Sequence, residues 1–204
     1  MAKIEFDEEK HVYTVGGTVY PSVTEIIKPI GSIFGGSPVP AEVIHSAAAR
    51  GSMVHEALQE YDLCGETEYV AEVEGYIKSY LTFLRDYSPE WEGVEEKIYN
   101  PFDGYCGTLD RRGVIGKQTY IVDLKTNTAP SAPQYFSVCA QTWAYAKAKY
   151  GAGAGGVRRA ALYLKSNGEY RFFECEKYEQ KKNVSGKQLF EICLSLYNMT
   201  RRNK

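Results

Sequence analysis

The sequence predicts an α/β (α+β) protein, in which a central mixed sheet is flanked by helices and preceded by an N-terminal β-hairpin. Along the chain the order of segments is helices, three strands, one helix, two strands and a last helix. The strand segments are rich in aromatic and β-branched residues and are bounded by Gly, Pro, Asn and Asp. The 204 residues, 44% of them hydrophobic, suit a single domain with its own core.

The N-terminal part is expected to hold a hairpin and a short helix within residues 1–30. Residues 11–20 alternate β-forming side chains around a Gly-Gly pair, which is typical of a tight hairpin. Ser22 and Glu25 have the spacing of a capping box, so a short helix should begin there. The Gly and Pro content of residues 29–40 predicts a loop.

Two helices should follow. Residues 41–63 are rich in helix-forming residues, with Gly51 as a weak point. Residues 69–87 place apolar side chains at spacings of three and four, which predicts an amphipathic helix that ends before Pro89.

The remaining segments complete a core that we place at about residues 40–175. In order, we expect strands at 94–99, 105–110 and 119–125, a helix at about 133–150, a hairpin made of 157–165 and 170–176, and a C-terminal helix over 177–204.

Composition excludes several classes of protein. Charged residues make up 25% of the chain and the net charge is −2, so no global basic character points to nucleic acid or membrane. The five cysteines are far apart and lack C-x-x-C spacing, which argues against a disulfide framework or a zinc site. The N-terminus lacks an apolar signal segment, and no run approaches 18 apolar residues. We therefore expect a soluble, cytoplasmic protein with no membrane partner.

The segment YIVDLKT, residues 120–126, carries an acid and a base on an otherwise apolar strand. Asp123 and Lys125 should share one face of this strand, because side chains alternate, while Val122 and Leu124 share the other. Burying both charges costs several kcal/mol unless they pair or bind something. The alternative is a partly exposed strand end with a solvated ion pair.

A second acid joins this pair. A hairpin turning through residues 111–116 would return Asp123 beside Asp110. Two close carboxylates repel unless a cation lies between them, and oxygen ligands suit Mg²⁺ or Mn²⁺. Such a metal beside Lys125 would suit phosphodiester cleavage. The alternative is that Asp110 simply opens the turn DRRG.

These residues resemble the PD-(D/E)xK nuclease superfamily, whose core has the order α-β-β-β-α-β. In that family an acid on the second core strand precedes a (D/E)-x-K on the third, as Asp110 precedes Asp123-Leu124-Lys125 here. The chain is more narrowly similar to the RecB-like exonuclease branch, which includes phage exonucleases and the mitochondrial genome maintenance exonuclease. Four further motifs carry this likeness: G-x-x-x-H at Gly51–His55, G-x-x-D at Gly107–Asp110, Q-x-x-x-Y at Gln141–Tyr145 and P-S-V-T at 21–24.

The resemblance implies a metal-dependent DNA exonuclease with roles in phage-type recombination, replication or repair, in the host cytoplasm if phage-encoded. It implies that His55, Asp110, Asp123 and the Leu124 carbonyl hold Mg²⁺ or Mn²⁺ and that Lys125 is the catalytic lysine. The residues expected to contact DNA are Arg50, Thr126, Gln141, Tyr145, Ser22 and Thr24. A single-strand annealing or recombination protein is a possible partner. The alternatives are a structure-specific or restriction-like endonuclease and a non-catalytic nucleic-acid-binding module.

Some residues have competing interpretations. Among the three histidines we favour His55 over His11 and His45 as a ligand, because His55 belongs to the G-x-x-x-H motif. The alternative is a structural role, which is common for a lone histidine on a helix. Tyr145 could equally pack into the core. Strand alternation should turn only one acid of the Glu95-Glu96 pair inward, and we favour Glu96 as an accessory acid.

Other sequence patterns do not indicate a cofactor. GAGAGG at residues 151–156 matches G-x-G-x-x-G, but it leaves a helix and enters a strand, so a flexible loop is expected. No phosphate-binding G-x-x-x-x-G-K-[ST] occurs, and no tight cysteine trio is present. We expect neither a nucleotide cofactor nor an iron–sulfur cluster.

Overall fold

The computed structural model describes residues 3–8, 10–35, 40–126 and 130–201. Its first unit is an antiparallel sheet of β1 (Ile4–Asp7), β2 (Val12–Val15) and β3 (Thr18–Tyr20), paired in that order. Gly16 and Gly17 form the β2–β3 turn with positive φ, a conformation that glycine adopts without a Cβ clash. The predicted hairpin is confirmed, and β1 extends it by one strand.

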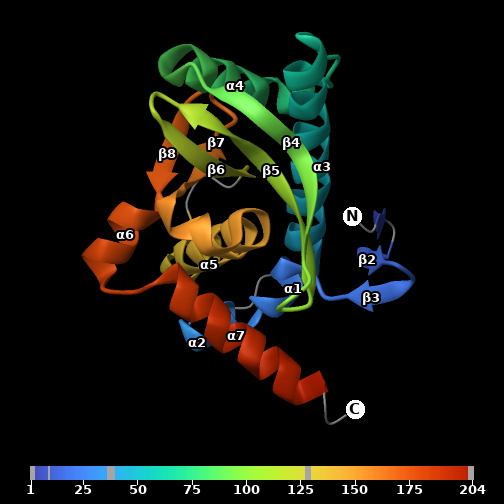
Figure 1. The fold of residues 1–204 in the computed structure, drawn as a ribbon. Coiled ribbons are helices and arrows are strands. Elements are labelled where there is room, and N and C mark those ends of the chain that lie inside the picture. Colours follow the sequence, from blue (N-terminus) through green and yellow to red (C-terminus); the bar gives the residue numbers. More distant parts are fainter. Residues whose placement is uncertain (1–2, 9, 36–39, 127–129, 202–204) are drawn as a thin grey trace.

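A five-stranded sheet forms the centre of the protein (Figure 1). Its strands are β4 (Glu90–Asn100), β5 (Tyr105–Ile115), β6 (Gln118–Lys125), β7 (Arg158–Leu164) and β8 (Tyr170–Glu174), and they lie side by side in chain order. Only β6 and β7 are parallel, and the other neighbours are antiparallel. A parallel pair needs a crossover, which α5 (Ala132–Tyr150) and the 3₁₀ helix η2 (Gly151–Gly156) supply.

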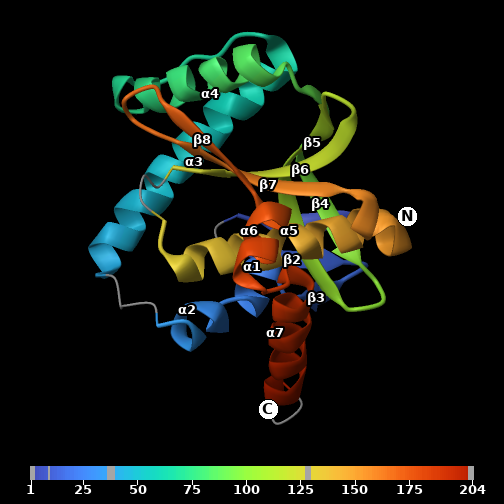
Figure 2. The same cartoon turned by 90° about the vertical axis from the view of Figure 1, so that its left-hand side faces the viewer.

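Helices cover both faces of this sheet (Figures 1 and 2). On one face lie α3 (Ala41–Cys64), the 3₁₀ helix η1 (Ala71–Val73) and α4 (Glu74–Tyr87), and on the other lies α5. Packed against α5 are α1 (Val23–Ile26), α2 (Pro29–Ile33), α6 (Cys175–Lys182) and α7 (Gly186–Arg201). The predicted class, a central mixed sheet flanked by helices, is confirmed.

Alternation along β6 sorts its side chains between two cores. Ile121 belongs to the core against α5, whereas Val122 and Leu124 belong to the core against α3 and α4. Asp123 therefore projects on the α5 side, as the sequence pattern predicted. Both faces of β6 are buried over residues 120–124, which explains why apolar residues dominate this strand.

The helices differ from the prediction in two places near the N-terminus. Residues 29–33 form α2 rather than a loop, because proline is well suited to the first position of a helix. Residues 36–39 of the predicted loop lie outside the described part of the chain. Helix α3 runs through Gly51 without a break, since one glycine costs only about 1 kcal/mol in a helix rich in good formers.

Two later helices also differ. The amphipathic helix begins only at Glu74, after the short 3₁₀ turn η1. The C-terminal helix expected over 177–204 is two helices, because Asn183 adopts a left-handed conformation that ends α6. No helix in the described ranges is both long enough and apolar enough to cross a membrane.

The strands β4 and β5 are longer than predicted, and this moves the turn between β5 and β6. The turn lies at Gly116, which has positive φ, rather than over residues 111–116. Asp110 is therefore inside β5 and does not open a turn. Residues 151–156 form a 3₁₀ helix instead of the expected loop.

Gly75 fixes the distance between α4 and the turn that joins β7 to β8. A Cβ at this position would lie 1.8 Å from the Ser166 carbonyl oxygen. We expect Gly75→Ala to lower the free energy of unfolding by roughly 1–3 kcal/mol, the usual cost of overpacking. Urea denaturation would measure it. The matched control is Gly31→Ala, because a Cβ at that position would have nothing within 4 Å; equal stability of the two variants would contradict the prediction.

Candidate metal centre

The candidate site lies where β5 and β6 separate. Their ladder ends with the pair Arg111 and Val122. One step further, the Asp110 carboxylate accepts a hydrogen bond from the Leu124 backbone N–H, with 2.6 Å between oxygen and nitrogen. A hydrogen bond from a side chain thus replaces the next backbone–backbone hydrogen bond between the two strands. It holds Asp110 and Leu124 together at the edge of the site.

His55 reaches this point from α3. Its Nε2 lies 3.3 Å from the Leu124 carbonyl oxygen, and its Nδ1 lies 3.1 Å from a Glu95 carboxylate oxygen. Burial by itself lowers the pKa of His55, but the charge of Asp110 and the hydrogen bond to Glu95 outweigh it and raise the pKa to about 9. Both ring nitrogens face acceptors, so an imidazolium fits this arrangement.

Three side chains form a group that could hold a metal ion. Ligand atoms of His55, Glu95 and Asp110 all lie within 4.8 Å of one another. Carboxylate oxygens are the preferred ligands of Mg²⁺ and Mn²⁺, and imidazole is acceptable to Mn²⁺. Of the predicted ligands, His55, Asp110 and the Leu124 carbonyl are brought together, Glu95 joins them, and Asp123 lies outside this group.

The acid supplied by β4 is Glu95, and the choice of Glu96 is corrected. The Glu96 carboxylate instead pairs with Arg112 and Lys149. Glu96 is opposite Leu109, whose side chain lies in the core against α5. Glu95 has a φ of 46°, a left-handed conformation that breaks regular alternation at this point of β4. The choice of Glu96 assumed that side chains alternate regularly along the whole strand, and this assumption fails at Glu95.

Asp123 and Lys125 form an ion pair beside the metal-ligating group. The Lys125 Nζ lies 2.6 Å from an Asp123 oxygen, and the Asp123 side chain is only 1% exposed. Among the described residues, the other oxygen of Asp123, Oδ1, has no hydrogen-bond partner. Burial raises the pKa of Asp123 to about 6, although Lys125 opposes the shift. The alternative of a solvated strand end therefore does not hold for this acid, and its unpaired oxygen suits a further cation.

Behind the site, Arg111 fixes the position of Glu95. The Arg111 side chain is fully buried, with its Nε 2.6 Å from Asp62 of α3 and its Nη1 3.1 Å from Glu95. The same Nη1 donates to the Asp110 carbonyl, and the Tyr80 hydroxyl donates to Asp62. Planar guanidinium groups hold carboxylates in fixed directions. Arg111 therefore ties α3, β4 and β5 together beside the ligands.

Sequence reasoning missed this support. Asp62 follows His55 by seven residues, two helical turns, so both side chains lie on one face of α3; that spacing was the available signal. Arg111 stands in a sequence, DRRG, that resembles an exposed turn, and its burial depends on β5 continuing past Asp110.

A cleft of about 340 Å³ opens between α3 and α5. Its walls include Arg50, Lys125, Thr126, Gln134, Gln141 and Tyr163. Three residues predicted to contact DNA, Arg50, Thr126 and Gln141, are thus gathered around the amine of Lys125. The cleft gives this amine, whose side chain is 34% exposed, an opening to solvent.

The other predicted contact residues have clear structural surroundings. Gln141 donates a hydrogen bond to the buried hydroxyl of Tyr145, whose ring packs into the core against α5. A Cβ on Gly107 would come within 2.7 Å of that ring, which explains the glycine. The Ser22 hydroxyl caps α1 and lies 3.0 Å from the Thr24 hydroxyl. DNA binding by Tyr145, Ser22 and Thr24 stays a prediction.

Comparison with known proteins adds only a distant likeness. No protein-family model matches the chain, and no match was found among curated proteins. Among solved structures, it is similar to an alkaline exonuclease (LHK-Exo) from Laribacter hongkongensis, with 10% identity, a TM-score of 0.38, and coverage of 90% of this chain and 92% of the other. LHK-Exo in complex with dAMP matches with 10% identity, a TM-score of 0.36, and coverage of 90% and 94%. At these TM-scores the likeness does not assign an activity.

His55 should make the metal-free protein less stable at high pH. Its pKa is raised from an ordinary 6.5 to about 9 in the folded state, so its stabilising effect is complete below pH 6.5 and is lost as pH rises through 9. In EDTA, we expect the free energy of unfolding to fall over this window, and His55→Asn to flatten the fall. Urea titrations at several pH values would test this; identical profiles would contradict it.

A divalent ion should stabilise the fold through this site. At 100 times its dissociation constant, Mn²⁺ should add about 2.7 kcal/mol to the free energy of unfolding. Asp110→Asn, which keeps an acceptor for the Leu124 N–H, should abolish the gain. Asp103→Asn is the matched control, because that acid pairs with Lys147 at the β4–β5 turn. Thermal unfolding with and without metal is the measurement, and an equal shift in both variants would rule the site out.

Proposed function

We propose that this protein is a Mg²⁺- or Mn²⁺-dependent deoxyribonuclease of the PD-(D/E)xK superfamily, of the RecB-like exonuclease type. One observation carries the proposal: the half-buried group of His55, Glu95 and Asp110 stands beside the Asp123–Lys125 pair at a cleft. This arrangement offers ligands for a cation and places an amine at an opening, and both features suit phosphodiester hydrolysis.

His55, Glu95, Asp110 and the Leu124 carbonyl would hold the ion, with Asp123 able to contribute. A bound divalent ion supplies positive charge to a phosphoryl oxygen and lowers the pKa of water. The unpaired Oδ1 of Asp123 and the acceptors around the His55 ring support the fit.

Lys125 would act on the reacting phosphate and its attacking water. Burial by itself lowers the pKa of Lys125, but Asp123 and Asp110 outweigh it and raise the pKa, so the amine keeps its charge. Asp123 fixes that amine at the wall of the cleft. A positioned ammonium orients water and offsets the negative charge that develops during phosphoryl transfer.

The cleft would hold the DNA backbone. Arg50 provides a cation, and Thr126 and Gln141 provide neutral donors in the cleft that Lys125 also lines. Such contacts fix the backbone without reading sequence. Action from a DNA end, a role in phage-type recombination, replication or repair in the cytoplasm, and an annealing protein as partner are parts of this proposal that follow from the family resemblance.

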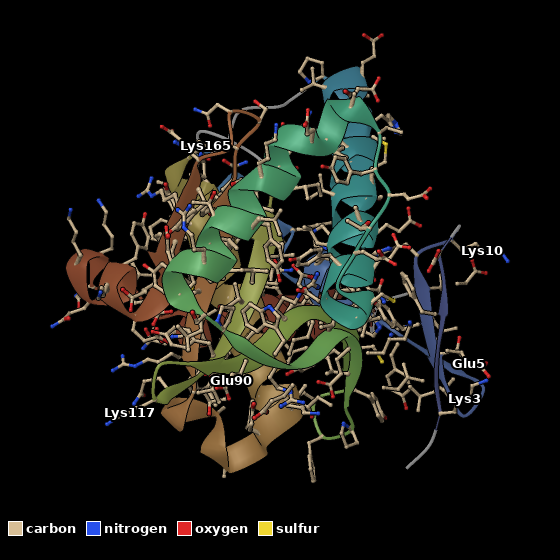
Figure 3. The ribbon with its side chains drawn as sticks, turned by 90° about the horizontal axis from the view of Figure 1, so that it is seen from above. Lys3, Glu5, Lys10, Glu90, Lys117 and Lys165 are labelled. Carbon is tan, nitrogen blue, oxygen red and sulfur yellow. The ribbon has the colours of Figure 1, made fainter. Side chains whose placement is uncertain are left out.

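Cleavage of end-labelled DNA tests the proposal. Linear and circular substrates, single- and double-stranded, would be incubated with Mg²⁺, with Mn²⁺ and with EDTA. We expect metal-dependent loss of linear DNA only, and a fall in kcat of roughly 100-fold or more in Lys125→Ala. Lys117→Ala is the matched control, because this exposed lysine lies in the β5–β6 turn, at the opposite end of β6 (Figure 3).

Each other outcome has a distinct meaning. Cutting of circular DNA would replace the exonuclease by an endonuclease. Binding of DNA that persists in EDTA without turnover would favour a non-catalytic module. Equal activity of Lys125→Ala and wild type would remove the proposed role of the lysine.

A further inference from the structure

A second depression adjoins the metal-ligating group, and it touches α3 at Gln59, whereas the α3–α5 cleft touches this helix at Arg50, on the other side of His55 along the chain. It measures about 280 Å³ and lies between the N-terminal sheet, α3 and the central strands. We call it the hairpin groove, and its walls include Phe6, His11, Tyr13, Gln59, Lys97 and Thr108. None of these residues has a part in the site described above.

The hairpin groove and the α3–α5 cleft meet the same site from different directions. Glu95 is part of the groove wall and also contacts His55. Lys125 is part of the cleft wall and pairs with Asp123. A phosphodiester carries a nucleotide on each side of its phosphorus, so a strand cut at this site needs space on both sides. Two depressions of about 300 Å³, flanking the ligands, provide that space.

The side chains of the groove suit a nucleotide. The Phe6 ring stacks on Tyr13 with 4.3 Å between centroids and meets His11 edge-on at 5.2 Å, which gives an aromatic surface of the kind on which bases stack. Lys97 is exposed and, within the described residues, forms no ion pair, so its charge is free for a phosphate. Glu8 on the rim is the one acid besides Glu95 among the lining residues.

Tyr13 anchors this aromatic surface to the central sheet. Its ring is buried, and its hydroxyl lies 2.9 Å from the Thr108 hydroxyl of β5. The face of the N-terminal sheet that carries Phe6 and Tyr13 forms a small core with Cys106 of β5. The aromatic wall is therefore fixed to the same strand that carries Asp110.

We propose that the hairpin groove binds one of the two nucleotides joined by the bond to be cut, with its base against Phe6 and His11 and a phosphate at Lys97. The proposal rests on the nuclease function above and extends it to a subsite formed by the N-terminal sheet. Its ligand is a single-stranded deoxynucleotide segment, because a base must be unpaired and turned out of a duplex before it can lie against Phe6 and His11.

Two groove variants and one control would test the subsite. His11→Asn removes the ring and tolerates the left-handed φ of 53° at this position, and Lys97→Gln removes the charge. Lys3→Gln is the matched control, because Lys3 is exposed at the outer edge of the N-terminal sheet and pairs with Glu5 (Figure 3). Thermal unfolding would confirm that all three fold like wild type.

Kinetics on single-stranded oligonucleotides provide the first readout. We expect KM to rise roughly 5- to 100-fold in His11→Asn, the range for loss of one base–aromatic stack, with kcat within about twofold. In Lys97→Gln, the slope of log KM against log salt should fall by about 0.7, the value for one lost phosphate contact on a single strand. Lys3→Gln should match wild type. Unchanged KM and salt slope in both groove variants would overturn the proposal.

A binding measurement separates this proposal from the nuclease itself. In the Lys125→Ala background, oligonucleotides carrying 2-aminopurine at successive positions would be titrated with protein and Mg²⁺. Stacking should quench the fluorescence at one position, and His11→Asn should restore it. If wild type cleaves DNA but no position is quenched in a His11-dependent way, the subsite fails alone. If wild type never cleaves, the nuclease function fails, and quenching still decides whether the groove binds a nucleotide.

Discussion

The hydrogen bond between the Asp110 carboxylate and the Leu124 N–H determines the rest of the site. A backbone–backbone hydrogen bond at this position would have kept β5 and β6 paired and left no room between them for other groups. The side-chain acceptor instead keeps Leu124 satisfied while its carbonyl turns toward His55. Because an unpaired buried N–H is costly, this contact lets the sheet open within an otherwise dry interior. The ligands, the ion pair and both depressions lie around that opening.

Acids and cations are paired around the opening. The acids are Asp62, Glu95, Asp110 and Asp123, and the cations are His55, Arg111 and Lys125. Each acid has a cation beside it, which limits the desolvation cost of burying this many charges. One negative charge remains in excess. A group of this kind stabilises the fold less than apolar residues would, and such a cost is usual where a site must bind a cation.

The fold brings distant parts of the chain to this point. Helix α3 approaches from one face of the sheet and α5 from the other, while the N-terminal sheet lies near β4 and β5 (Figures 1 and 2). Arg111 links three of these parts through Asp62, Glu95 and the Asp110 carbonyl. The ligands are therefore held by elements that pack on two separate cores, and the position of each depends on the whole sheet.

The sequence by itself determined most of the element types, the mixed α/β class, the shared face of Asp123 and Lys125, and the approach of Asp110 to the next strand, because these follow from local periodicity and from pairing of neighbouring strands. The place of His55 beside them followed from the family resemblance. Only the tertiary structure decided the rest. The left-handed kink at Glu95 reverses which acid faces the site, and the continuation of β5 buries Arg111, where the local sequence resembles a turn. Both depend on contacts with α3, far away in sequence, and on the energy of the whole sheet, which no local pattern contains.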